Sequence, residues 1–133
     1  MIALRAKWTI RVDDLKTRLT LGGPHAEHRP ESILVSLVIN GLAPDTPGQL
    51  SDCLDYAPIC HWITHEWPRL QATPLLESRV NELLGYLFGY DKRVQDAWVA
   101  VYRAGPSRGS TRVGVARQAS RAQFQARLRS ARD

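Results

Sequence analysis

The chain has 133 residues, of which 44% are hydrophobic, and a formal net charge of +5. This length suits one hydrophobic core and is too short for two domains of ordinary size. Arg5, Lys7 and Arg11 interrupt the apolar residues at the start, which argues against a signal peptide or a membrane span and predicts a cytoplasmic protein. The two cysteines, Cys53 and Cys60, match neither a redox pair nor a zinc knuckle, so we expect two half-buried thiols.

Alternation of apolar and polar residues predicts two strands in the first third of the chain. The first covers residues 8–21 and changes phase at Asp13 and Asp14, which predicts a bulge or bend near its middle. A turn-rich loop is expected over residues 22–32. The apolar run over residues 33–40 then predicts a strand that is buried over much of both faces.

A helix is predicted after the loop over residues 41–52. Asp52 or Asp55 is placed to cap a helix that starts near Tyr56, and Pro68 would end it. Its apolar stripe consists of Ile59, Trp62, Ile63 and Trp67.

A second, stronger helical pattern covers residues 74–87, with Pro74 as a first-turn proline and a glycine stop expected between Gly85 and Gly89. One face carries Leu76, Val80, Leu83, Leu84 and Leu87. Glu77 lies in the first turn, near free backbone donors and the positive end of the helix dipole. A carboxylate there can accept two parallel N–H bonds from an amidine-like ligand group, or it can be a solvated acid at a helix start.

Two further strands are predicted over residues 97–103 and 111–119, with a turn between them. The element order is therefore strand, strand, helix, helix, strand, strand. Residues 120–133 form a basic extension that we expect to be a short amphipathic helix, either packed on the domain or partly frayed. The alternative for this tail is contact with an anion or a nucleic acid, although it lacks the interleaved aromatic residues of a single-strand binder.

These elements and motifs resemble the dihydroneopterin aldolase family over roughly residues 8–119. The likeness is carried by the loop HAEHRPES, the segment LSDCLDYAPI, the helix start PLLE and the turn AVYRAGP. The resemblance implies an α+β tunnelling fold, in which a four-stranded antiparallel sheet carries two helices on one face. It also implies one domain over residues 1–119 and a homo-oligomer, a ring tetramer or octamer, with the pocket at the subunit interface.

The resemblance further implies residue roles. Glu77 would anchor the aminopyrimidine edge of a reduced pterin, Tyr56 would stack on its ring from a neighbouring subunit, and Glu27 would act at the reacting end. Backbone groups of Leu54, Asp55 and Leu76 would complete the substrate cradle. A flat ring with a guanidine-like edge does suit one carboxylate and one aromatic face.

Arg103 departs from the family pattern, because it stands where the resemblance expects the catalytic lysine. A lysine can be tuned by its surroundings to transfer protons near neutral pH, whereas an arginine stays charged in essentially any site. Arg103 would therefore hold an anion or orient a water molecule rather than pass protons.

His61 and His65 lie one helical turn apart, but the sequence places no third ligand beside them. We expect surface histidines, no metal site and no cofactor.

Two functions follow. The first is an aldolase-type lyase of folate or related pterin biosynthesis, which cleaves 7,8-dihydroneopterin to 6-hydroxymethyl-dihydropterin and glycolaldehyde, with Glu27, Arg103 and Tyr56 as catalytic residues. The second is a pterin- or purine-binding homologue without turnover. Nucleic-acid and membrane partners are not expected.

Overall fold

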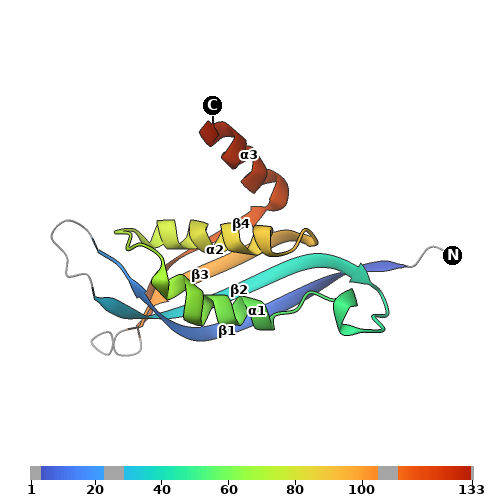
Figure 1. The fold of residues 1–133 in the computed structure, drawn as a ribbon, viewed down its shortest axis with the longest axis horizontal. Coiled ribbons are helices and arrows are strands. Elements are labelled where there is room, and N and C mark those ends of the chain that lie inside the picture. Colours follow the sequence, from blue (N-terminus) through green and yellow to red (C-terminus); the bar gives the residue numbers. More distant parts are fainter. Residues whose placement is uncertain (1–3, 23–28, 105–110, 133) are drawn as a thin grey trace.

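The computed structural model describes residues 4–22, 29–104 and 111–132. In chain order the elements are β1 (Arg5–Thr20), β2 (Pro30–Pro44), a 3-10 turn (Leu50–Asp52), α1 (Ala57–His61), a π-helical turn (Trp62–Glu66), a 3-10 turn (Trp67–Arg69), α2 (Leu76–Tyr90), β3 (Val94–Arg103), β4 (Val113–Ser120) and α3 (Arg121–Arg132). The predicted order of strands and helices is confirmed, and a third helix follows at the C-terminal end (Figure 1).

The four strands form one antiparallel sheet in the order β1-β2-β3-β4. The β1–β2 register shifts between Val12 and Leu15, which confirms the predicted bulge. Asp14 within it has a positive φ of 56°, a conformation that aspartate tolerates better than most residues. β1 begins at Arg5, before its predicted start at residue 8. β2 begins at Pro30, inside the segment expected to be a loop, and runs on to Pro44.

The core lies between one face of the sheet and the helices. Alternate residues of β2 and β3 on this face, such as Val35 and Val99, are fully buried, and Thr17 of β1 donates a 2.8 Å hydrogen bond from its hydroxyl to the Ile63 carbonyl oxygen. The predicted apolar face of α2 is confirmed: Leu76, Val80, Leu83, Leu84 and Leu87 are all buried. No helix in the described part of the chain covers the other face of the sheet (Figure 1).

The predicted glycine stop is wrong, because α2 continues through Gly85 and Gly89 to Tyr90. Arg121 of α3 fixes the C-terminal end of α2. The Arg121 guanidinium donates hydrogen bonds to the Phe88 and Asp91 carbonyl oxygens, 3.0 and 2.8 Å away. A Cβ at Gly85 would lie 3.4 Å from the Phe124 ring of α3, so this glycine faces the junction with α3.

The first predicted helix is present but irregular, because α1 runs into a π-helical turn and then a 3-10 turn. Thr64 bonds back to the Cys60 carbonyl oxygen at 2.9 Å, and Pro68 has no amide hydrogen for a regular α-helical bond. The packing still follows the predicted stripe: Ile59, Ile63 and Trp67 are buried. Trp62 stacks on Tyr86 with 4.1 Å between ring centroids.

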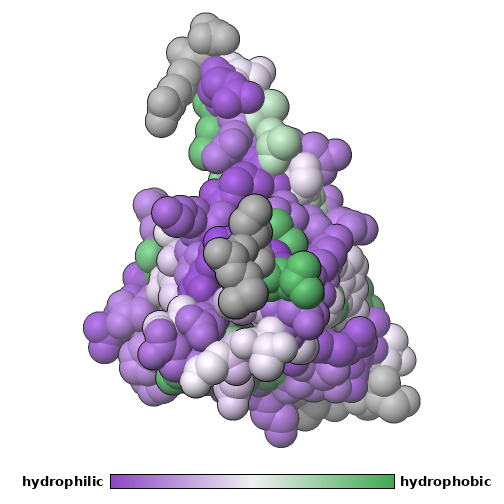
Figure 2. Space-filling view, turned by 90° about the vertical axis from the view of Figure 1, so that its right-hand side faces the viewer, coloured by the Kyte–Doolittle hydropathy of each residue, from purple (hydrophilic) through white to green (hydrophobic). Residues whose placement is uncertain are grey.

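α3 rises from the body of the domain, with its N-terminal turns attached and a mostly hydrophilic surface (Figures 1 and 2). Phe124 is buried against Phe88, with 5.3 Å between ring centroids, whereas Leu128 one turn later is half-exposed. This confirms the expected helical tail. Within the described part of the chain, no helix is long and apolar enough to cross a membrane.

Candidate functional site

Glu77 lies in the first turn of α2, with its side chain exposed to solvent. The N-cap residue, Leu75, provides no side-chain cap, so backbone donors of the first turn are open beside the carboxylate. Leu75 itself is 54% exposed, while Leu76 is buried beneath it. The Ser78 amide already donates to the Leu75 carbonyl oxygen at 3.2 Å, so the helix start offers the Glu77 carboxylate and the amides of Leu76 and Glu77 next to an exposed apolar side chain.

Arg79 fixes this helix start from inside the core. It is fully buried, donates from Nη2 to the Thr20 carbonyl oxygen at 2.8 Å, and forms an ion pair from Nη1 to Glu82 at 2.9 Å. Trp67 donates to the same Glu82 oxygen at 2.9 Å. The bond to Thr20 ties the beginning of α2 to the end of β1. Arg79 was not among the predicted site residues, although its place three residues after Leu76 puts it on the apolar face of α2.

Tyr56 lies directly before α1 and is 61% exposed. The backbone that presents it is held firmly. Asp55 accepts the Ala57 amide hydrogen at its Oδ1, 3.0 Å away, and its carbonyl oxygen accepts the Tyr90 hydroxyl at 2.7 Å. The predicted capping role of Asp55 is thus confirmed. Burial, together with the nearby Asp55 carboxylate, raises the pKa of Tyr90, so this hydroxyl remains a donor.

A second anchor holds the segment before Tyr56. The Arg93 guanidinium donates to the Ser51 and Cys53 carbonyl oxygens at 3.2 and 3.3 Å and pairs with Asp91 at 2.9 Å. Hydrogen bonds from Arg93 lower the pKa of Asp91, which keeps the pair charged. Leu54 lines a small apolar pocket of about 170 Å³ between this segment and Trp8 of β1.

The candidate site falls into two half-sites, one at Glu77 and the start of α2, the other at Tyr56 and the start of α1. Within one subunit they lie at opposite ends of α2 (Figure 1). Tyr90, in the last turn, contacts Asp55, whereas Glu77 lies in the first turn. Thirteen helical steps lead from Glu77 to Tyr90, which is about 20 Å at 1.5 Å per step. A ligand the size of a pterin ring cannot contact Glu77 and Tyr56 of the same subunit.

Arg103 ends β3 and is engaged by a carboxylate that sequence analysis missed. Its Nη1 lies 2.7 and 2.8 Å from the two oxygens of Glu31, and both side chains are partly exposed. Glu31 lies within the segment predicted to be a loop, but it pairs with Leu19 in the β1–β2 ladder. Glu27 lies outside the described residues. Arg103 is thus one half of an ion pair, at the end of the sheet where β1 approaches the start of α2.

His61 and His65 stack with 4.4 Å between ring centroids on the exposed side of the first helical segment. Among the described residues, no group of three or more histidine, cysteine or acidic side chains is arranged to hold a metal ion.

The architecture is that of the tunnelling fold, as found in dihydroneopterin aldolases. The Escherichia coli dihydroneopterin aldolase, solved in complex with neopterin, superimposes with a TM-score of 0.68 at 15% identity, over 84% of this chain and 98% of that one. The Burkholderia thailendensis dihydroneopterin aldolase, solved bound to guanine, gives a TM-score of 0.66 at 15% identity, over 86% of this chain and 92% of that one. No protein-family model and no curated protein matches the sequence. At this identity the likeness defines the fold.

Proposed function

We propose that this chain belongs to the dihydroneopterin aldolase family and binds a reduced pterin in a pocket shared by two subunits. The observation that carries the proposal is the arrangement of Glu77 and Tyr56. Both side chains are exposed on firmly held backbone, yet they lie at opposite ends of α2. The division into a domain over residues 1–119 and an extension over residues 120–133 stays a prediction, as does a cytoplasmic location.

The two half-sites have complementary chemistry for a pterin. The Glu77 carboxylate can accept two parallel bonds from the aminopyrimidine edge, and the amides of the first α2 turn can donate to the ring carbonyl oxygen. Tyr56 of a neighbouring subunit offers an aromatic face for stacking. Backbone groups of Leu54, Asp55 and Leu76 complete the cradle. The ligands of two proteins with this fold, neopterin and guanine, share the edge that such a carboxylate would hold.

An oligomer is part of the proposal. β1 and β4 are the two edges of the sheet, and unpaired strand edges favour pairing with another chain. Apolar side chains are exposed on both edges, with Trp8 of β1 at 46% and Val113 of β4 at 48%. A ring tetramer, single or stacked as an octamer, would pair these edges and bring Tyr56 of one subunit toward Glu77 of the next.

The reaction in this proposal is retro-aldol cleavage of the dihydroneopterin side chain. It needs a proton removed from a side-chain hydroxyl and another delivered to the pterin fragment. Arg103 stays protonated and is paired with Glu31. Its part would be to hold Glu31 and orient water, while water or Glu27 carries the protons.

The same ion pair favours a second candidate, a pterin- or purine-binding protein without turnover. Arg103 bonds to both Glu31 oxygens through Nη1 alone, and a guanidinium that stays charged has little capacity for acid–base catalysis. Release of glycolaldehyde from dihydroneopterin distinguishes the two functions: product formation supports the lyase, and retained binding without product supports the binding protein.

Calorimetric titration with neopterin tests the pocket itself. Glu77→Gln should preserve the fold and weaken binding by about 2–4 kcal/mol, because a charge-assisted fork is lost and a ligand donor is left poorly paired. Glu66→Gln is the matched control, since Glu66 is an exposed acid outside both half-sites. Equal neopterin affinity in wild type and Glu77→Gln would remove Glu77 from the site and overturn the proposal.

A further inference from the structure

We propose that the helix-free face of the sheet carries a separate binding site for the phosphoryl group of a small molecule. A pocket of about 660 Å³ opens between β1, β2 and the residues that lead into β4. This volume lies within the range of small-molecule sites. The lining residues are Lys16, Thr17, Arg18, Ser32, Ile33, Leu34, Ala104, Thr111 and Arg112.

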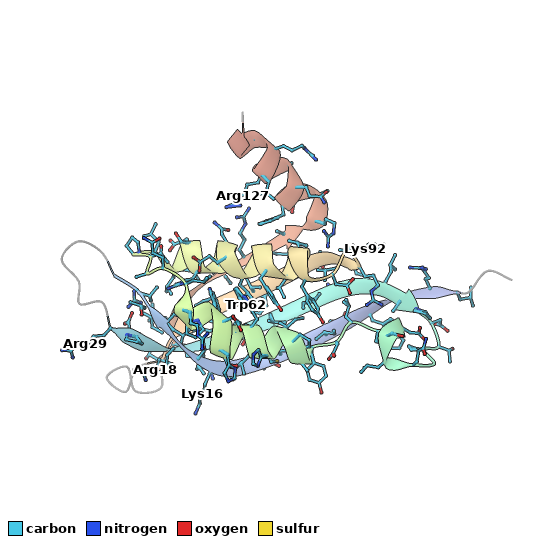
Figure 3. All side chains as sticks on the ribbon, in the orientation of Figure 1. Lys16, Arg18, Arg29, Trp62, Lys92 and Arg127 are labelled. Carbon is cyan, nitrogen blue, oxygen red and sulfur yellow. The ribbon has the colours of Figure 1, made fainter. Side chains whose placement is uncertain are left out.

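Among the residues that the structure describes, the lining holds three cationic side chains and no acid. Lys16 makes no ion pair or hydrogen bond with any other described residue. Arg18 uses one guanidinium nitrogen, Nη2, which donates to the Pro30 carbonyl oxygen at 3.1 Å, so its other donors remain available. Figure 3 shows these two side chains close together at one end of the sheet, far from Lys92 at the other end. An uncompensated positive charge of this kind favours an anionic ligand.

Arg112 forms one wall of the pocket. It pairs with Asp14 through both terminal nitrogens, with Nη2 3.2 Å from Oδ2. Asp14 belongs to β1 and Arg112 leads into β4, so the pair joins the two edge strands across the helix-free face. Three strand spacings of about 4.8 Å would separate these strands in a flat sheet, so a long arginine and a curved sheet are both needed. The β1 bulge places Asp14 to accept this bond, and Ser36 Oγ accepts its amide at 3.1 Å.

A phosphoryl group fits this chemistry better than a carboxylate or an apolar ligand. Its several oxygens can accept bonds at once from an ammonium group, a guanidinium and hydroxyls. The Ser32 and Thr111 side chains supply such hydroxyls at the pocket wall. Because the Arg112–Asp14 pair crosses the face, the pocket suits a compact anion rather than a long polyanion. The site is independent of Glu77 and Tyr56.

Calorimetric titration of the full-length chain with inorganic phosphate and pyrophosphate, at constant ionic strength set with potassium chloride, tests this site. We expect saturable binding in wild type and at least a tenfold loss of affinity, ~1.5 kcal/mol for a charged hydrogen bond, in Lys16→Gln and in Arg18→Gln. Lys92→Gln is the charge-matched control, since Lys92 is an exposed lysine far from the pocket.

Absence of saturation in wild type would overturn the proposal, as would an equal loss in Lys16→Gln and Lys92→Gln, which would indicate general charge attraction. A single-stranded oligonucleotide that binds more tightly than pyrophosphate and depends on Lys16 would overturn the assignment to a small molecule. Glu77→Gln should bind phosphate normally, so the result is independent of the proposed pterin pocket.

Discussion

A shared pocket makes a quantitative prediction about mixed oligomers. Co-expression of Glu77→Gln and Tyr56→Ala subunits in equal amounts, followed by purification through two different tags, gives oligomers that contain both. Each pocket would draw Glu77 from one subunit and Tyr56 from its neighbour. With random mixing, about one quarter of the pockets combine an intact Glu77 with an intact Tyr56. The reason is geometric: about 20 Å of α2 separates Glu77 from Tyr90, whose hydroxyl contacts Asp55 beside Tyr56 in the same subunit.

The two substitutions should lower neopterin affinity enough for calorimetry to distinguish intact pockets from mutated ones. Loss of the Glu77 fork should weaken neopterin binding about 30- to 1,000-fold, and loss of the Tyr56 ring about 5- to 30-fold. Calorimetry on the mixed oligomers should therefore find about a quarter of the sites at wild-type affinity. Neither variant alone should show such sites, and light scattering reports whether each forms an oligomer. Absence of wild-type sites in a mixed oligomer would refute the shared pocket, as would a monomeric wild type.

Two further predictions concern Arg103 and Asp91. Arg103→Lys should raise the rate of glycolaldehyde release about a hundred- to ten-thousand-fold with little change in neopterin affinity, because a lysine beside Glu31 can transfer protons; a slower variant would give Arg103 a role of its own. Hydrogen bonds from Arg93 lower the pKa of Asp91 in the folded protein. The ionised Asp91 therefore stabilises the fold fully above its unfolded pKa of about 3.9, and this stabilisation is lost as the pH falls through the lower folded pKa. Asp91→Asn should thus reduce the free energy of unfolding by about 1 kcal/mol at pH 7 and much less at pH 2 in urea titrations, whereas an equal loss at both would contradict this linkage.

The sequence predicted those features that periodicity encodes. Burial of one face gives strands their two-residue period and α2 its three- and four-residue spacing, so the strands, the bulge and the apolar face of α2 could be predicted without coordinates. Arg79 could have been found in the same way, since a charged residue on an apolar face needs buried partners.

The wrong or missing predictions depend on contacts between distant residues. α2 continues past Gly85 to Tyr90, where Arg121 of α3 supplies the partners for the Phe88 and Asp91 carbonyl oxygens. The Glu31–Arg103 pair joins residues 72 positions apart, and the Arg112–Asp14 pair joins residues 98 positions apart. Such pairs follow from strand register and sheet curvature, which local patterns do not specify.

The two half-sites, one at Glu77 and one at Tyr56, are similar in character. Each half-site combines polar groups with an exposed apolar side chain, Leu75 beside Glu77 and Tyr56 beside Asp55. Single exposed apolar residues are common on protein surfaces. Here they coincide with both half-sites and, through Trp8 and Val113, with both sheet edges. Pairing of the sheet edges would bury Trp8 and Val113. It would also bring the Glu77 half-site of one subunit next to the Tyr56 half-site of another. Assembly and ligand binding should therefore be lost together when the edges are disrupted.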